Sequence, residues 1–201
     1  MLAHAHKNIP FEIKNTIPGS EDEEFRQASP TGKVPGYKTD AGTTFADSSV
    51  IIAYLERTAS ENSLYPENNE DYAQALWFEE WADTELMQAT GALYFQRVVG
   101  PTFFKHETDL ARVDEILTTL IPKVFTLLES RLTEQAWLVG DDFSIADLAV
   151  GSCLISLLHA EYSIEQSNWP KIFSYNERLL ALPIVQAQLS AEKSFFKAAI
   201  S

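Results

Sequence analysis

Apolar residues follow two different patterns along the chain, and the change comes in the polar stretch "ENSLYPENNEDY" at residues 61–72. Before it, the predicted elements are short. The alternation of Phe11 and Ile13 in "PFEIKNT" favours a strand, and "VPGYK" and "TTF" are typical of two strands around the turn "TDAG". The segments "SEDEEFRQA" and "SSVIIAYLER" favour helices, the second with one apolar side (Val50, Ile51, Tyr54 and Leu55).

After the polar stretch the pattern is helical. Apolar residues recur every three or four positions in residues 109–132, where Pro122 predicts a kink because proline interrupts the helical hydrogen bonds. In "DFSIADLA", Ser144 and Asp147 have the spacing of a capping box. A catalytic pair is disfavoured there, because no histidine is placed as its base. The remaining predicted helices are residues 70–98, 144–158, 170–181 and 185–199.

Composition narrows the classes of function. The chain has 201 residues, 45% of them apolar, and a net charge of −14, which disfavours nucleic acid and anionic membranes as partners. No apolar run approaches the ~20 residues of a membrane span. The single cysteine, Cys153, cannot form an internal disulfide, which fits a reducing cytoplasm.

The segments "KVPGY" and "ADSS" carry the candidate chemistry. A cis Val34–Pro35 bond would leave the backbone groups of Val34 free to pair with an extended peptide. A helix that opens at Ser48 presents unpaired amides to a carboxylate. Asp47 suits an ammonium group, and Lys33 suits a second carboxylate. Each piece alone is more often a plain turn or a helix cap, but together they indicate a site for a small zwitterionic peptide.

These segments resemble the cytosolic, bacterial-type glutathione transferase family. "SPTGKVPGY" is similar to its cis-proline segment, "FADSSVIIAYLE" to its glutathione-binding helix start, and "GDDFSIADLA" and "WPKIFSYNERLLALP" to later helices. The resemblance implies an α+β protein: a thioredoxin-like domain at residues 1–62, whose first strand is missing here, and an all-α helical bundle at residues 70–201.

The resemblance also implies roles for single residues. Val34 would bind the cysteinyl backbone of glutathione beside the cis-proline Pro35. Asp47 and Ser48 would hold the γ-glutamyl end, and Lys33 the glycine carboxylate. A small apolar electrophile would bind against residues 86–104. The family further implies a cytoplasmic homodimer that acts in detoxification without a metal.

One expected feature is absent from the sequence. The family carries a Ser, Tyr or Cys after its first strand to stabilise the glutathione thiolate, whereas the first hydroxyl after Met1 here is Thr16. Either the natural protein starts upstream and supplies that strand, which we favour, or it lacks the strand. No catalytic residue is therefore assigned, and two hypotheses stand: a glutathione transferase, or a non-catalytic binding module on the same scaffold.

Other candidate residues have structural interpretations. His4 and His6 are expected on the surface, because on a helix they point apart and do not share a metal. Cys153 is expected to be a small buried residue in an apolar helix. Trp77 and Trp81 are expected in the core or in a subunit contact.

Overall fold

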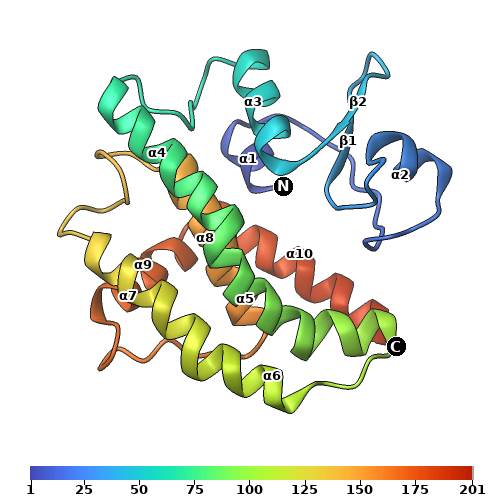
Figure 1. The fold of residues 1–201 in the computed structure, drawn as a ribbon. Helices are drawn as coiled ribbons and strands as arrows, with labels where there is room; N and C mark the ends of the chain where they lie inside the picture. The colour runs from blue at the N-terminus through green and yellow to red at the C-terminus, as the bar shows by residue number, and fades with distance from the viewer. Residues whose placement is uncertain (201) are drawn as a thin grey trace. The chain divides into compact units, whose positions relative to one another are not determined.

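The computed structural model describes the backbone of residues 1–200 and the side chains up to Phe195. The chain forms two compact units, with Ala3–Ser63 in the first and Leu64 onward in the second. Figure 1 shows that the first unit is mixed and the second helical. No helix in the described part of the chain is long and apolar enough to cross a membrane.

The first unit is built on a two-stranded antiparallel sheet. Strands β1 (Gly36–Lys38) and β2 (Thr44–Ala46) pair in the register that places Tyr37 opposite Phe45. Three helices accompany them: α1 (Leu2–His6), α2 (Glu23–Ala28) and α3 (Ser48–Thr58). The predicted hairpin and both predicted helices are confirmed.

The predicted strand "PFEIKNT" is wrong. Residues 9–17 form neither helix nor strand, and Phe11 and Ile13 are 40% and 52% exposed. A strand is stable only when its backbone groups have a neighbouring strand to pair with. The described residues place no such neighbour beside this segment, so its alternating pattern has no sheet to join.

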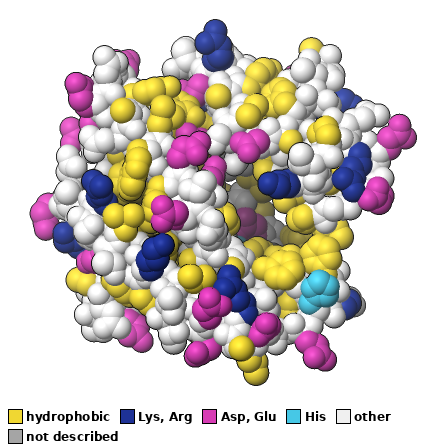
Figure 2. Space-filling view, viewed as in Figure 1, with side chains coloured by type: hydrophobic (Ala, Val, Ile, Leu, Met, Phe, Trp, Pro, Cys, Tyr) yellow, Lys and Arg dark blue, Asp and Glu magenta, His cyan; other side chains and the backbone are white. Residues whose placement is uncertain are grey.

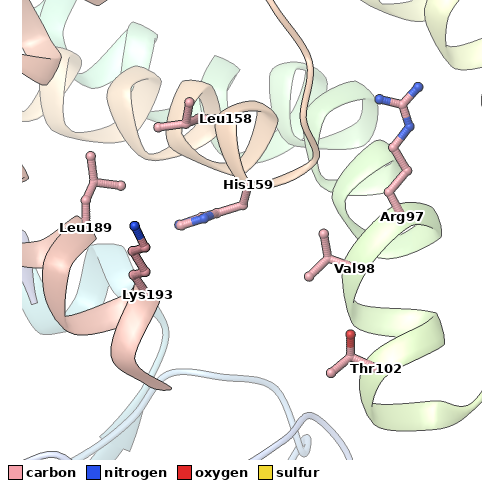
Figure 3. A pocket seen from close by; sticks show the side chains of 7 residues that line it. All are labelled: Arg97, Val98, Thr102, Leu158, His159, Leu189 and Lys193. Carbon is pink, nitrogen blue, oxygen red and sulfur yellow. The ribbon is translucent and has the colours of Figure 1, made fainter. Parts of the chain in front are cut away.

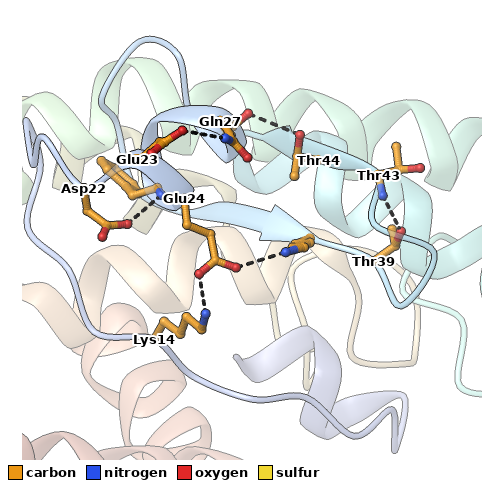
Figure 4. Close-up of polar contacts among 10 residues, drawn as sticks. Lys14, Asp22, Glu23, Glu24, Gln27, Thr39, Thr43 and Thr44 are labelled. Atoms are coloured by element: carbon orange, nitrogen blue, oxygen red, sulfur yellow. Dashed lines mark hydrogen bonds and ion pairs between the residues drawn. The ribbon is translucent and has the colours of Figure 1, made fainter.

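Helix α2 is held to the hairpin and to the preceding loop by polar contacts (Figure 4). Asp22 caps the helix by accepting from the amide of Phe25 at 2.8 Å. Glu24 accepts from Lys14 and, at 3.1 Å, from Lys38 of β1. These ion pairs are exposed, so they orient the segments more than they stabilise them.

A buried lysine fastens α1 to the end of α3. The Lys7 ammonium, with no exposed side-chain surface, pairs with Glu56 at 2.9 Å. It also donates to the carbonyls of Glu61 and Asn62 at 3.1 and 3.3 Å. All three N–H groups of the ammonium thus have partners, as burial of a charge requires.

The buried face of α3 differs in part from its prediction. Ile51, Ile52 and Leu55 are buried, whereas Val50 and Tyr54 are 50% and 37% exposed. The Tyr54 ring instead packs at the edge of the hairpin, against Tyr37 and Phe45. The prediction placed the apolar stripe about one residue too early, because the sequence alone does not reveal which side of the helix meets the sheet.

The second unit is helical throughout. Its long first helix runs without a break into two π-helical segments, so it extends beyond the predicted end at residue 98. A further π-helical segment ends at Leu120, two residues before Pro122, which cannot donate the usual helical hydrogen bond. The elements are α4 (Asn69–Trp81), η1 (Ala82–Leu86), α5 (Met87–Tyr94), η2 (Phe95–Phe104), α6 (Leu110–Glu115), η3 (Ile116–Leu120), α7 (Ile121–Arg131), α8 (Ile145–His159), α9 (Pro170–Leu180) and α10 (Pro183–Ile200).

The core of this unit centres on α8, which lies along α4 and α5 (Figure 1). The predicted capping box is confirmed, since Asp147 accepts from the Ser144 amide at 3.0 Å. Asp147 also accepts from the amide of Leu138 at 2.9 Å and from the hydroxyl of Tyr175 at 3.0 Å. The carboxylate is therefore a buried structural hub that joins α8, α9 and the loop before α8.

Candidate functional site

The loop before β1 presents unpaired backbone at the surface. The Val34–Pro35 peptide bond is cis. The N–H and C=O groups of Val34 make no hydrogen bond with the described residues, and its side chain is 45% exposed. Both groups can therefore pair with the backbone of an extended peptide.

A single hydrogen bond places this loop against the start of α3. The Asp47 amide donates to the Pro35 carbonyl at 3.3 Å, at the open end of the β1–β2 pair. Asp47 has a φ of 82°, in the left-handed region that non-glycine residues seldom adopt. Such outliers cluster at ligand sites, and this one turns the chain from β2 directly into the helix.

At the helix start, Asp47 and Ser48 have separate tasks. Asp47 is the N-cap: its Oδ1 accepts from the amides of Ser49 and Val50 at 3.0 and 3.4 Å. The Asp47 Oδ2 atom and the hydroxyl of Ser48 make no hydrogen bond with the described residues, and both residues are exposed. The helix therefore offers a carboxylate oxygen and a hydroxyl side by side, at its positive end.

Lys33 lies on the same loop, directly before Val34. Its carbonyl accepts from the buried hydroxyl of Ser29 at 2.5 Å, which holds the loop backbone in place. Its side chain is exposed and forms no ion pair with the described residues. The ammonium can therefore meet an anion in solution.

Together these groups can recognise a small peptide that carries both charges. Free amide and carbonyl groups suit its backbone, the helix start suits a carboxylate, and the free oxygen of Asp47 suits an ammonium group. The hydrogen bond between Asp47 and Pro35 brings the loop and the helix start together, and Val34 and Ser48 adjoin these two residues in the sequence.

Sequence reasoning missed the role of His4, which was expected on the surface. The residue is 4% exposed, and its Nδ1 lies 3.2 Å from the Ile9 carbonyl. Its ring packs on Phe11 and Tyr37, with centroids 4.6 and 5.6 Å away. Burial lowers the pKa of His4. The histidine is thus part of an aromatic cluster with Phe11 and Tyr37, and no local pattern in the sequence signalled this.

Cys153 lies in the helical unit and is buried, as expected. Burial raises the pKa of its thiol to about 12, so the group stays protonated. Its sulfur lies 3.7 Å from the Ala82 carbonyl. Among the described residues, no group of three or more His, Cys, Asp and Glu side chains is placed to hold a metal ion. On the face drawn in Figure 2, acidic and basic side chains are interspersed.

The sequence matches known proteins over both units. Residues 1–63 match the family described as "Glutathione S-transferase, N-terminal domain", and residues 94–192 match "Glutathione S-transferase, C-terminal domain". Glutathione S-transferase 1 of Zea mays is 31% identical over 161 residues, which cover 79% of this chain and 72% of the relative. The chain belongs to the cytosolic glutathione transferase family.

Other relatives of this glutathione transferase family member carry names that describe different functions. Glutathione S-transferase stcT of Emericella nidulans is 28% identical over 184 residues, covering 89% of this chain and 79% of the relative. Elongation factor 1-gamma of Artemia salina is 26% identical over 200 residues, which are 98% of this chain but only 44% of that protein. The relatives therefore include proteins named as glutathione transferases and proteins named as elongation factors.

Solved structures agree with the fold. A glutathione S-transferase from Rhodospirillum rubrum F11 has a TM-score of 0.83 and 19% identity, with coverage of 92% of this chain and 82% of that one. Glutathione S-transferase-I bound with lactoylglutathione has a TM-score of 0.79 and 26% identity, with coverage of 92% and 89%. The first unit is thus a thioredoxin-like domain with a small sheet, followed by the helical domain of the family.

Proposed function

We propose that this chain binds glutathione at the loop before β1 and the start of α3, and transfers it to small apolar electrophiles. The hydrogen bond from the Asp47 amide to the Pro35 carbonyl carries the proposal. It joins unpaired peptide backbone to an open helix N-terminus, and glutathione needs both: an extended backbone and charged ends. The named transferase relatives support the same substrate.

Each site residue has a specific task in the proposal. The free N–H and C=O of Val34 pair with the cysteinyl residue of glutathione, and Pro35 shapes that loop. Ser48 and the α3 amides receive the γ-glutamyl carboxylate, while Asp47 Oδ2 receives its ammonium group. Lys33 receives the glycine carboxylate by charge attraction.

Transfer requires the glutathione sulfur as a thiolate. A free thiol with a pKa near ~8.5 is mostly protonated at neutral pH, so a donor beside the sulfur must favour the anion. The thiol of Cys153 does not supply it, because this side chain is buried in the helical unit.

The proposed function extends to the oligomeric state and the cellular location of the protein. We propose an isologous homodimer that uses the face of α4 where Trp77 is 42% exposed. We also propose a cytoplasmic location, in line with the single buried cysteine, and a role in detoxification through conjugation of apolar electrophiles.

A second candidate function is a non-catalytic binding module. One structural observation favours it: residues 9–17, which follow α1, form neither helix nor strand. The similarity to elongation factor 1-gamma, which is not named as a transferase, points the same way. In this alternative the chain binds glutathione, an apolar ligand or a protein partner without turnover.

Two measurements separate the candidates. Calorimetry with glutathione tests the site, and conjugation of a chromogenic aryl halide tests the chemistry. Binding with turnover supports the transferase, and binding without turnover supports the module. If glutathione does not bind, the loop and helix start are only structural, and the peptide site is rejected.

A further inference from the structure

The cavity drawn in Figure 3 belongs with the proposed transferase function. It opens between η2, α8 and α10, and its η2 wall (Arg97, Val98 and Thr102) lies within residues 86–104, where a small apolar electrophile is expected. Another part of the helical unit carries a cavity of different chemistry.

This second cavity, of about 360 Å³, lies between α9 and the loop that follows α7, and its volume is in the range of small-molecule sites. Its lining is largely polar and includes Thr133, Glu134, Gln135, Lys171, Ser174 and Arg178. None of these residues belongs to the glutathione site or to residues 86–104. A ligand bound here would therefore be separate from both proposed substrates.

Helix α9, which forms one wall of the second cavity, is firmly held. Tyr175 is 1% exposed, and its hydroxyl donates to Asp147 at 3.0 Å. At the start of the helix, the carboxylate of Glu129 accepts from the amides of Lys171 and Ile172, both at 2.9 Å. Because these helix amides are already occupied, recognition of a ligand in the cavity falls to the side chains of α9 and of the loop.

Two cations of α9 face this cavity from the same side of the helix. Lys171 and Arg178 are seven residues apart, which is two helical turns. Lys171 Nζ donates to the Leu132 carbonyl at 2.8 Å, and Arg178 donates to the carbonyl of Ala136. Each of these contacts engages one N–H group, so both cations keep further N–H groups for a ligand.

The acids near the second cavity do not neutralise these cations. Neither Lys171 nor Arg178 forms an ion pair with any residue that the structure describes. Glu129 is engaged with the α9 amides, and Glu134, which lines the cavity, forms no ion pair with the described side chains. The lining thus carries more positive than negative charge, which favours an anionic ligand.

The spacing of the two cations favours a ligand with two acidic groups. Seven residues of α-helix rise about 10.5 Å, and the contacts with the loop carbonyls hold the cations apart. Charge-assisted hydrogen bonds of about 2.8 Å at each end leave roughly 5 Å between two acidic groups, about the separation of the carboxylate carbons in a five-carbon dicarboxylate. A small monoanion can engage only one of the two cations.

We propose that this cavity binds a short aliphatic dicarboxylate, with one carboxylate at Lys171 and the other at Arg178. The side-chain amide of Gln135 lines the cavity and supplies a further donor. Binding here would be independent of glutathione and of transferase activity, because no residue is shared with those sites.

The test is calorimetry at low salt on the full chain without glutathione, with glutarate and pentanoate as probes. Glutarate is expected to bind at least about tenfold more tightly, since its second carboxylate adds a charge-assisted contact. Lys171→Met and Arg178→Met are each expected to lower glutarate affinity to that of pentanoate. Lys123→Met, which removes an exposed lysine on α7, is the matched control and is expected to change neither affinity.

Two further variants locate the bound dicarboxylate. Glu134→Gln removes a like charge from an exposed position, so it should fold normally and raise glutarate affinity at least about twofold. Lys33→Met tests whether glutarate binds at the proposed glutathione site instead. Thermal unfolding confirms that each variant is folded.

Several results overturn the proposed dicarboxylate site. The wild type may fail to bind glutarate or bind both probes equally. The folded Lys171→Met and Arg178→Met variants may bind glutarate as Lys123→Met does. Glu134→Gln may leave glutarate affinity unchanged or lower it, or Lys33→Met may reduce it as much as Lys171→Met.

Discussion

The amide of Asp47 donates to the carbonyl of Pro35 at 3.3 Å. This contact joins two segments of the candidate site, Val34–Pro35 and the start of α3 at Asp47–Ser48, which are separated in the sequence by the β1–β2 hairpin. The same residue caps α3 through its side chain. Asp47 thus links the loop to the helix with its amide and keeps one carboxylate oxygen free for a ligand.

The Ser48 variant tests recognition of the γ-glutamyl carboxylate. Ser48→Ala removes a hydroxyl that has no partner among the described residues. A hydrogen bond to a charged group is worth about 1.5–3 kcal/mol, so glutathione affinity is expected to fall by about tenfold or more. Calorimetry measures this loss. Stability should be nearly unchanged, because Asp47 and not Ser48 is the N-cap.

Asp47→Asn tests the ammonium contact at the same site. Asparagine can still cap the helix, so folding should persist while the charge is lost. Binding of glutathione should weaken, whereas an analogue without the free ammonium should bind as before. Ser190→Ala, an exposed serine of α10, serves as control. If both variants bind glutathione as tightly as the wild type, the start of α3 has only a capping role.

Lys7→Met tests the buried ion pair of the first unit. The substitution removes the buried cation that pairs with Glu56 and the hydrogen bonds that Lys7 donates to two carbonyls. Loss of one partner of a buried pair costs about 3–5 kcal/mol, so the urea midpoint should fall strongly. The double variant Lys7→Met with Glu56→Leu should be less destabilised than the sum of the two single variants. If the losses of stability in the two single variants add up to that of the double variant, Lys7 and Glu56 are not coupled.

The buried His4 predicts a pH dependence of stability. Burial holds its pKa below the ordinary value of 6.5, although the Ile9 carbonyl opposes the shift. The folded state therefore binds fewer protons than the unfolded state, and stability present above pH 6.5 is lost as the pH falls toward the folded pKa. The pKa of His6 is also lowered by burial, so both contribute in the same direction.

His4→Phe keeps an aromatic ring beside Tyr37 and removes the titrating group. Urea unfolding between about pH 7.5 and 5.5 should show a shallower loss of stability in this variant than in the wild type. His106→Phe, at an exposed position, is the matched control. Parallel pH profiles for wild type and His4→Phe contradict the assignment.

The buried Cys153 predicts an unreactive thiol. With its pKa raised to about 12, the folded protein should react with a disulfide reagent far more slowly than the urea-unfolded chain. Cys153→Ala should retain any conjugation activity within about twofold, once folding is confirmed. Rapid labelling of the native protein is the result that argues against burial.

The exposed Trp77 predicts a subunit contact. Its ring stacks on Trp81 with centroids 6.0 Å apart, and the Arg131 guanidinium lies 5.1 Å from its centroid. Light scattering at micromolar concentration should give twice the monomer mass, and Trp77→Ser should shift the equilibrium toward monomer. Leu110→Ser, at a position 77% exposed on α6, should leave the mass unchanged. A monomeric wild type excludes the dimer.

Local signals in the sequence were sufficient for most elements. The spacing of Ser144 and Asp147 predicted the start of α8, because a capping box is satisfied within one helical turn. The hairpin of β1 and β2 followed from its turn, and the apolar period predicted the helices of the second unit. These features depend on neighbours a few residues away, so the sequence alone determined them.

Tertiary structure decided the rest. The strand expected at Phe11 and Ile13 does not form, since a strand needs a partner that its own sequence cannot provide. His4 is buried because Phe11 and Tyr37, distant in sequence, pack on it. The contact of Asp47 with Pro35, and the division of tasks between Asp47 and Ser48, also depend on how the hairpin closes. Local sequence specifies propensities and caps, while burial and long-range partners come only with the folded chain.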